Sequence, residues 1–410
     1  MNDENIFKIY KFRLYPTKKQ TEKLDWTLET CRILYNSCLA DRNRHYKETG
    51  KGLSRKKQQK ILTQDKEKIS YLFSIHSQVL QDVLFRAEKA YNDFFRRLKE
   101  KKGKAGYPRF KNIGRYDSIT YPQSGFSIED GKLKISKIGS IKLKQHRSIN
   151  GIIKTCNIKK EIDKWYVCLS VEYAPLEKNY TINSHIGIDA GIKSFIALSS
   201  GKTIDNPKHL SKSERKLIKK QKQLSSKKKG SNNRKKAVKA VAKLHKKISN
   251  QRKDFHHKVS RVLVNNYDAI GSEDLQIKNM VKNHNLAKSI NDAGWGQFLS
   301  FLDYKAEEAG KLFMKVNPRD TSKNCHICGY TYTDMTLDIR KWTCPACNTV
   351  HDRDVNAACN IDKRMLEKIR QELPEYTLAE TGSMDDIVVN DYALKSISSL
   401  KQEASSVRAR

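Results

Sequence analysis

Four cysteines toward the C-terminal end of the sequence have the spacing of a metal site. They form two Cys-x-x-Cys pairs separated by 15 residues: Cys325 with Cys328, and Cys344 with Cys347. Each pair can direct two thiolates at one ion, and four thiolates complete a closed tetrahedral zinc site with no open coordination position. A redox dithiol would need only one pair. We therefore predict one structural Zn²⁺ in a small ribbon, with His326 and His351 as spare ligands whose expected role is hydrogen bonding.

Three carboxylates occupy positions where an acid is structurally awkward. Asp189 interrupts the apolar strand "IGIDAGI", Glu273 ends the strand "AIGSE", and Asp354 lies in the first turn of the helix "DVNAACNI". A buried carboxylate is costly unless it is paired or binds a cation. Asp354 has an alternative role as a helix cap, which Asp352 could fill equally well. Spacing alone does not show whether the three acids converge.

The amino-acid composition indicates which class of partner the protein binds. The 410 residues contain 81 Lys and Arg against 45 Asp and Glu, a formal charge of +36 that predicts binding to a polyanion. We find neither an apolar run of about 18 residues nor an N-terminal signal sequence. The five cysteines outside the two pairs are scattered, which favours a reducing compartment over a disulfide framework. We expect a cytoplasmic prokaryotic protein whose partner is nucleic acid, with no membrane contact.

Half of the net charge lies in one segment. Residues 206–258 contain 17 Lys and 3 Arg against one Glu and one Asp, a net charge of +18. Apolar residues at helical spacing predict helices with basic outer surfaces, and "SSKKKGSNNRKK" predicts a loop between them. The alternative is a merely solubilising face, but so strong a bias favours contact with nucleic-acid backbone. The candidate contacts are Lys219, Lys220, Lys235, Lys236, Lys246 and Lys247.

The chain also contains motifs that resemble those of a known family. "GIDAGIKSF", "GSEDL", the two cysteine pairs and "DRDVNAACNI", in that order, are similar to the nuclease of the TnpB family. Bacterial and archaeal insertion sequences encode these proteins, which are related to the type V CRISPR effectors. The similarity continues upstream through "FRLYPTKKQ", "AYNDFFRRLK" and "GYPRFK" and covers roughly residues 5–365.

The resemblance implies a multidomain α+β and α/β architecture. Its expected parts are a discontinuous β-barrel wedge domain (1–16 and 104–183), a helical recognition domain (17–103), a RuvC-like nuclease domain of RNase H fold (184–323) with the basic helical segment 206–260, an inserted zinc ribbon (324–350), the end of the nuclease domain (351–373) and a poorly ordered tail (374–410). The alternating segments around 6–15 and 117–177 independently predict strands, and we expect the first strand to join the others.

The resemblance also implies the chemistry. Asp189, Glu273 and Asp354 would together bind two catalytic Mg²⁺ ions and cut double-stranded DNA, and Asp352 would be a neighbour that caps the helix. A guide RNA from the transposon end, one protein per RNA, would select the target, and the N-terminal domains would read a short adjacent motif. By position in the family, the candidate motif-reading residues are Gln81, Tyr121 and Gln123.

Two other functions fit parts of the sequence. An RNA-guided DNA-binding repressor could descend from the same fold, but such derivatives are expected to lose one or more acids, and this chain retains all three. A DNA transposase or its accessory factor would fit the zinc ribbon and the charge, although we see no separate Tyr or Ser recombinase signature. Both predict binding to DNA without guided cleavage.

Overall fold

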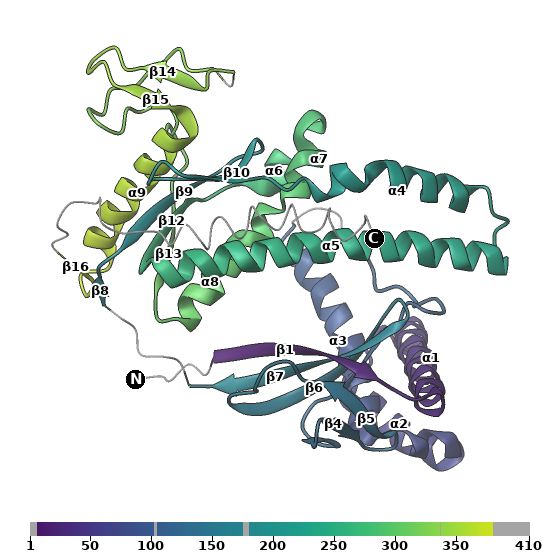
Figure 1. The fold of residues 1–410 in the computed structure, drawn as a ribbon. Helices are drawn as coiled ribbons and strands as arrows, with labels where there is room; N and C mark the ends of the chain where they lie inside the picture. Colours follow the sequence, from purple (N-terminus) through teal and green to yellow (C-terminus); the bar gives the residue numbers. More distant parts are fainter. Residues whose placement is uncertain (1–5, 102–104, 175–179, 337, 380–410) are drawn as a thin grey trace. The chain divides into compact units, whose positions relative to one another are not determined.

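The computed structural model describes residues 6–101, 105–174, 180–336 and 338–379. The chain divides into two compact units, Met1–Ala174 and Pro175–Arg410 (Figure 1). In the described parts, no helix is both long and apolar enough to cross a membrane.

The first unit contains a seven-stranded antiparallel sheet. Its order is β2-β6-β7-β1-β5-β4-β3. The strands are β1 (Ile6–Tyr15), β2 (Ser118–Tyr121), β3 (Phe126–Glu129), β4 (Lys132–Ile135), β5 (Gly139–Lys144), β6 (Ile152–Glu161) and β7 (Lys164–Tyr173). Because β1 pairs with both β7 and β5, the N-terminal strand joins the later strands as expected.

Alternation along the strands decides which face of this sheet is buried. Tyr10, Phe12 and Leu14 of β1 point into the core, whereas Phe7 and Ile9 are exposed on the other face. The edge strands β2 and β3 are consecutive in sequence, so the sheet must curve to bring them near each other. No hydrogen-bonded strand pair joins β2 to β3 among the described residues, so the sheet forms a half-barrel where the sequence predicts a β-barrel.

Helices cover the buried face of this sheet and share one hydrophobic core with it. They are α1 (Lys18–Thr49), α2 (Arg55–Lys68) and α3 (Ser77–Lys99), with a 3₁₀ turn at Ser70–Ser74. The N-terminus of α1 is fixed by a capping box between Thr17 and Gln20, and the helix ends at Gly50, whose φ of 65° is left-handed.

The second unit contains a five-stranded mixed sheet of order β11-β10-β9-β12-β13. The strands are β9 (His185–Ala190), β10 (Ser194–Leu198), β11 (Thr203–Asp205), β12 (Ala269–Glu273) and β13 (Leu312–Val316). β9, β12 and β13 are parallel, whereas β10 is antiparallel to both of its neighbours, β9 and β11. This confirms the mixed helix and sheet character that the sequence predicts.

Helices lie on both faces of the mixed sheet (Figure 1). On one face α5 (Asn232–Asn266) and α8 (Trp295–Glu308) bury an aromatic core, and on the other lies α9 (Arg353–Glu372). A Cβ added to Gly187 of β9 would lie 2.1 Å from the carbonyl oxygen of Ala358 in α9. Only glycine therefore allows α9 to approach β9 this closely.

The basic segment folds into a hairpin of α4 (His209–Ser225) and α5. The loop predicted over 225–236 is shorter than expected, because Ser231 caps α5 and residues 232–236 are already helical. Two further short helices, α6 (Ile277–Met280) and α7 (His284–Ala293), precede α8.

The C-terminal part differs from the expected tail at its start. Beyond α9, β16 (Thr377–Leu378) pairs in parallel with β8 (Thr181–Ile182), so residues 377–378 are part of a small sheet. The remainder of the predicted tail, 380–410, lies outside the described residues. β8 belongs to the second unit and not to the sheet of the first, because Ile182 packs in a core with Ile361 and Met365 of α9.

Candidate active site

Three separate elements bring the predicted carboxylates to one pocket. Asp189 lies near the end of β9 and Glu273 at the end of the adjacent strand β12, whose Ser272 is in register with Ile188. Asp354 lies in the first turn of α9, which packs against both strands. All three side chains line an open pocket of about 650 Å³. The sequence could not show this proximity, since it depends on strand order and on the placement of α9.

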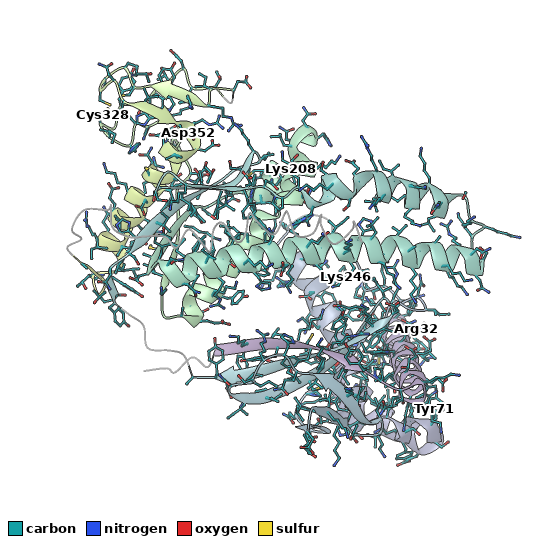
Figure 2. The ribbon with its side chains drawn as sticks, in the orientation of Figure 1. Arg32, Tyr71, Lys208, Lys246, Cys328 and Asp352 are labelled. Carbon is teal, nitrogen blue, oxygen red and sulfur yellow. The ribbon has the colours of Figure 1, made fainter. Side chains whose placement is uncertain are left out.

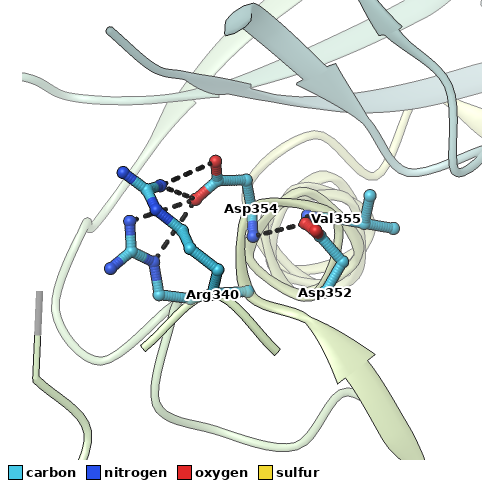
Figure 3. Close-up of polar contacts among 5 residues, drawn as sticks. Arg340, Asp352, Asp354 and Val355 are labelled. Atoms are coloured by element: carbon cyan, nitrogen blue, oxygen red, sulfur yellow. Dashed lines mark hydrogen bonds and ion pairs between the residues drawn. The ribbon is translucent and has the colours of Figure 1, made fainter. Parts of the chain in front are cut away.

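The neighbouring Asp352 has a structural role. Its Oδ1 accepts the backbone N–H groups of Asp354 at 3.0 Å and Val355 at 3.2 Å, which makes it the N-cap of α9 (Figure 3). The side chain of Asp354 is therefore not needed as the cap and faces the pocket. This resolves the alternative that the sequence left open between the two aspartates.

Burial raises the pKa of two of the carboxylates, and neighbouring negative charge adds to the shift at Asp189. Burial, followed by repulsion from Glu273 and Asp354, raises the pKa of Asp189 to about 8. Burial also raises the pKa of Glu273, although a hydrogen bond from the hydroxyl of Thr321 and the charge of Arg364 oppose that shift. Negative charge in this pocket is therefore unfavourable without a compensating cation.

Two arginines compensate part of this charge at Asp354 (Figure 3). Arg340 Nη1 lies 3.2 Å and 3.1 Å from the two carboxylate oxygens, and Arg353 Nη2 lies 3.2 Å from Oδ1. Arg340 immediately precedes the ribbon strand β14 (Lys341–Thr343), and Arg353 follows β15 (Val350–Asp352). The ribbon hairpin thus places the guanidinium group of Arg340 next to the carboxylate of Asp354. Sequence reasoning missed both arginines.

The donor set of the pocket suits a hard divalent cation. Carboxylate oxygens are the ligands that Mg²⁺ prefers, and the negative charge of Glu273 and Asp354 beside Asp189 favours a bound cation. The three carboxylates do not form a tight cage, however. Among the described residues, the four cysteines are the one group of three or more His, Cys, Asp or Glu whose donor atoms all lie within 4.8 Å of one another.

The four cysteines converge as the sequence predicts, and their geometry fits zinc. The Sγ atoms of Cys325 and Cys347 are 3.7 Å apart, and those of Cys328 and Cys344 are 3.6 Å apart. Four thiolates at a Zn–S distance of about 2.3 Å would be separated by about 3.8 Å in a tetrahedron. Each pair is held in a similar turn, closed by Gly329 N–H to Cys325 O and by Asn348 N–H to Cys344 O.

The two candidate histidines act as hydrogen-bonding groups. His351 is buried against Trp342, and its Nε2 lies 3.1 Å from Cys325 Sγ. His326 Nδ1 lies 3.0 Å from Asn356 Oδ1 on α9. Neither belongs to the compact cysteine set, so the expectation of hydrogen-bonding roles agrees with the structure.

Asparagines of α9 connect the ribbon to the carboxylate pocket. Asn356 and Asn360 donate side-chain hydrogen bonds to the carbonyl of Asn324, and Asn360 also binds the carbonyl of Thr321. Thr321 in turn donates to Glu273. One continuous network therefore ties the start of the ribbon to both α9 and a candidate ligand. Two buried asparagines four residues apart in "DVNAACNI" were the sequence signal that could have revealed it.

The expected motif-reading residues divide into two kinds. Gln81 and Gln123 are exposed and line a shallow pocket of about 390 Å³ together with Gln59 and Gln78. Tyr121 is only 1% exposed, and its hydroxyl donates to the carbonyl of Ser136. The expectation for Tyr121 therefore needs correction, because a core side chain of this kind presents no atom to DNA. Alternation along β2 directs it inward.

The candidate backbone-contacting lysines lie on the α4–α5 hairpin, where Figure 2 labels Lys246. Five of the six are exposed, and Lys246 is partly buried.

Comparison with known proteins decides the family. Residues 6–51 match a family described as "Helix-turn-helix domain", residues 167–284 one described as "Probable transposase", and residues 295–361 "Cas12f1-like, TNB domain". A Streptomyces pristinaespiralis protein named "Putative RNA-guided DNA endonuclease" is 34% identical, over 87% of this chain and 89% of its own length. The chain belongs to the TnpB family.

A second relative agrees with this membership. The TnpB-family chain is 30% identical to the Escherichia coli K12 protein named "Putative RNA-guided DNA endonuclease InsQ", over 86% of this chain and 90% of that one. It aligns with a solved structure of "the mini-RNA-guided endonuclease CRISPR-Cas_phi3" over 88% of this chain and 92% of that one, with 10% identity and a TM-score of 0.47. The match described as helix-turn-helix covers β1 and the single long helix α1.

Proposed function

We propose that this TnpB-family protein is an RNA-guided, Mg²⁺-dependent endonuclease that cuts double-stranded DNA. The observation that carries the proposal is the position of Asp189, Glu273 and Asp354 in one pocket, although each comes from a different element. The names of the relatives support guided DNA cleavage. We assign the five-stranded sheet and its helices to a RuvC-like nuclease domain of RNase H fold, and the sheet and helices of the first unit to wedge and recognition domains.

Each residue has a role in this proposal. Asp189, Glu273 and Asp354 would hold two Mg²⁺ ions, which when bound supply an activated water and stabilise the leaving oxygen. Asp352 fixes the first turn of α9, and Thr321 orients Glu273. The four cysteines would hold one structural Zn²⁺ and thereby position the hairpin that carries Arg340.

The nucleic-acid partners follow from charge and position. We propose that one protein binds one guide RNA derived from the transposon end, and that the lysines of the α4–α5 hairpin contact nucleic-acid backbone. Gln81 and Gln123 are proposed to read a short motif beside the target, since a glutamine amide can pair bidentately with adenine. Base pairing with the RNA would read the target itself.

The test uses protein co-expressed with the RNA from its own transposon end. A plasmid library with a guide match beside a randomised segment is incubated with the complex and Mg²⁺, and the surviving plasmids are sequenced. Depletion of plasmids that share one short motif, absent with Asp354→Asn, is the expected result. Binding to matched DNA without any cleavage by the wild-type complex would contradict the nuclease proposal and favour the repressor. Joining of transposon ends without RNA would favour the transposase.

A further inference from the structure

The C-terminal end of α3 and the loop after it expose a group of aromatic rings. Phe95 is 58% exposed, Phe110 56% and Tyr107 48%. Rings so exposed remain largely in water, so burial in the core does not explain them. They lie in residues 94–101 and 105–113, which we call the aromatic-basic surface.

Part of this surface is held in place by a hydrogen bond and by contacts between rings. The Tyr107 hydroxyl donates to Asn43 Oδ1 at 2.5 Å, and its ring packs edge-on against Phe94 and Tyr91, with centroids 5.2 Å and 5.6 Å away. Phe94 also packs against Phe95, with centroids 5.2 Å apart. Phe95 and Tyr107 therefore belong to a fixed cluster of rings, and a ligand that stacks on these two would not have to order them.

The loop is fixed to α1 at a second point. Asn36 accepts the backbone N–H of Lys111 at 2.8 Å and donates to its carbonyl at 3.0 Å. Asn36 and Asn43 are seven residues apart on α1, which corresponds to about 10 Å along the helix axis. That length matches about three nucleotides of a stacked strand at about 3.4 Å each.

Charge indicates what the surface binds. Residues 94–101 and 105–113 contain six Lys and Arg against one Glu. Arg97, Arg109 and Lys111 are exposed and lie within two residues of these rings in the sequence. A protein interface is depleted of lysine at its centre, whereas basic side chains interleaved with exposed aromatics are typical of single-strand nucleic-acid surfaces. A duplex would not offer its base faces to such rings, because they are already stacked.

We propose that the aromatic-basic surface stacks unpaired nucleotides of single-stranded RNA. The proposal rests on the proposed function in one respect: a guide provides an unpaired RNA strand whenever the complex exists, whereas unpaired DNA exists only after a target is opened. Phe95, Tyr107 and Phe110 are the stacking rings, and Arg97 and Arg109 contact the phosphates. Sequence tolerance is expected, because every base has a π face.

The first test locates the binding surface directly. The full-length protein is cross-linked to an unstructured oligouridine that contains 4-thiouridine, and the cross-linked peptides are identified by mass spectrometry. Cross-links within the aromatic-basic surface are expected in the wild type and are expected to disappear in Phe95→Ala/Phe110→Ala. Phe7→Ala is the matched control, because Phe7 is also 56% exposed and lies in the same unit. Absence of wild-type cross-links from the aromatic-basic surface would overturn the proposal.

The second test separates stacking from charge. Removal of each ring should weaken binding of the same RNA about tenfold without changing its salt dependence. Arg97→Ala and Arg109→Ala should each reduce the slope of log affinity against log salt by about 1. Phe95→Trp/Phe110→Trp should retain affinity, because tryptophan also stacks.

Two further measurements test whether single-stranded DNA or a second copy of the protein binds the aromatic-basic surface instead. If Phe95→Ala/Phe110→Ala weakens binding of single-stranded DNA and leaves RNA binding unchanged, the RNA assignment is overturned. It is also overturned if the RNA-free wild-type protein forms a dimer and the double variant is a monomer. None of these measurements depends on cleavage. A protein that fails to cut DNA but shows the expected cross-links would contradict the proposed function and leave this inference standing.

Discussion

Asp352 Oδ1 accepts the backbone N–H of Asp354 at 3.0 Å, so one aspartate of the "DRD" sequence holds the helix turn that carries the other. The carboxylate of Asp354 points away from that cap toward Arg340 and Arg353 (Figure 3). Two acids of the same type, two residues apart, therefore have separable roles.

This separation can be measured with a pair of substitutions. Asp352→Ala should reduce the free energy of unfolding by about 1 kcal/mol through loss of the cap, and Asp352→Asn should restore it, because asparagine also caps helices. Asp354→Asn should abolish DNA cleavage and leave the melting temperature nearly unchanged. Chemical denaturation and plasmid cleavage would be measured for all three variants. Full cleavage by Asp354→Asn would remove that residue from the proposed ligand set.

The pKa of Asp189 predicts a pH dependence of stability. With a folded-state pKa raised to about 8 from 3.8, the folded protein retains a proton that the unfolded chain has released. The stability contributed by this group therefore falls as pH rises from about 4 to about 8. Asp189→Asn has no such proton. The free energy of unfolding of this variant minus that of the wild type should therefore increase between about pH 4 and about pH 8 and stay constant above that range.

Thermal unfolding without added divalent cation, at several values between about pH 5 and about pH 9, would measure this difference. Added Mg²⁺ should reduce the difference in stability between the two proteins, because the cation stabilises the ionised carboxylate of the wild type. Parallel stability curves for the two proteins over the whole range would show that Asp189 titrates normally.

The hydrogen bond from Thr321 to Glu273 predicts a change in the pH profile of cleavage. Thr321→Val removes a hydrogen bond that lowers the pKa of Glu273, so the rising limb of cleavage rate against pH should move to higher pH. Loss of a group that orients a proposed ligand should also slow cleavage about tenfold. Thr321→Ser keeps the hydroxyl and is the control. An identical pH profile for the valine and serine variants would contradict this role.

The cysteine geometry predicts that zinc is needed for folding of the ribbon. Cys325→Ser with Cys344→Ser removes two buried thiolates, so zinc measured by elemental analysis should fall from one equivalent to none. The melting temperature should fall as well, because the network from Asn324 to α9 depends on the folded ribbon. Cys359→Ser, outside the cluster, should retain zinc. Stoichiometric zinc in the double variant would contradict the ligand assignment.

The α4–α5 hairpin predicts a salt effect on RNA binding. If Lys219 and Lys220 each neutralise one phosphate, replacing both with alanine should reduce the slope of log affinity against log salt by about 2. The corresponding Lys→Arg double variant keeps the charge and should keep the slope. Equal slopes for the alanine and arginine variants would show that these exposed lysines only solubilise the protein.

The sequence by itself determined the features that depend on neighbouring residues. Two Cys-x-x-Cys pairs specify the ribbon, because each pair forms a turn of a few residues that directs both thiolates to one point. Alternation along residues 6–15 specified a half-buried strand, and its burial pattern agrees. Ordered motifs also identified the family before any geometry was known.

Only the tertiary structure decided which distant groups meet. Asp189, Glu273 and Asp354 share a pocket because β9 and β12 are parallel neighbours and α9 packs against them, and no local pattern encodes that arrangement. Arg340 reaches Asp354 only through the fold of the ribbon hairpin. Tyr121 was placed at the DNA surface by motif position but points into the core, because the direction of a side chain in a strand depends on which face packs against helices.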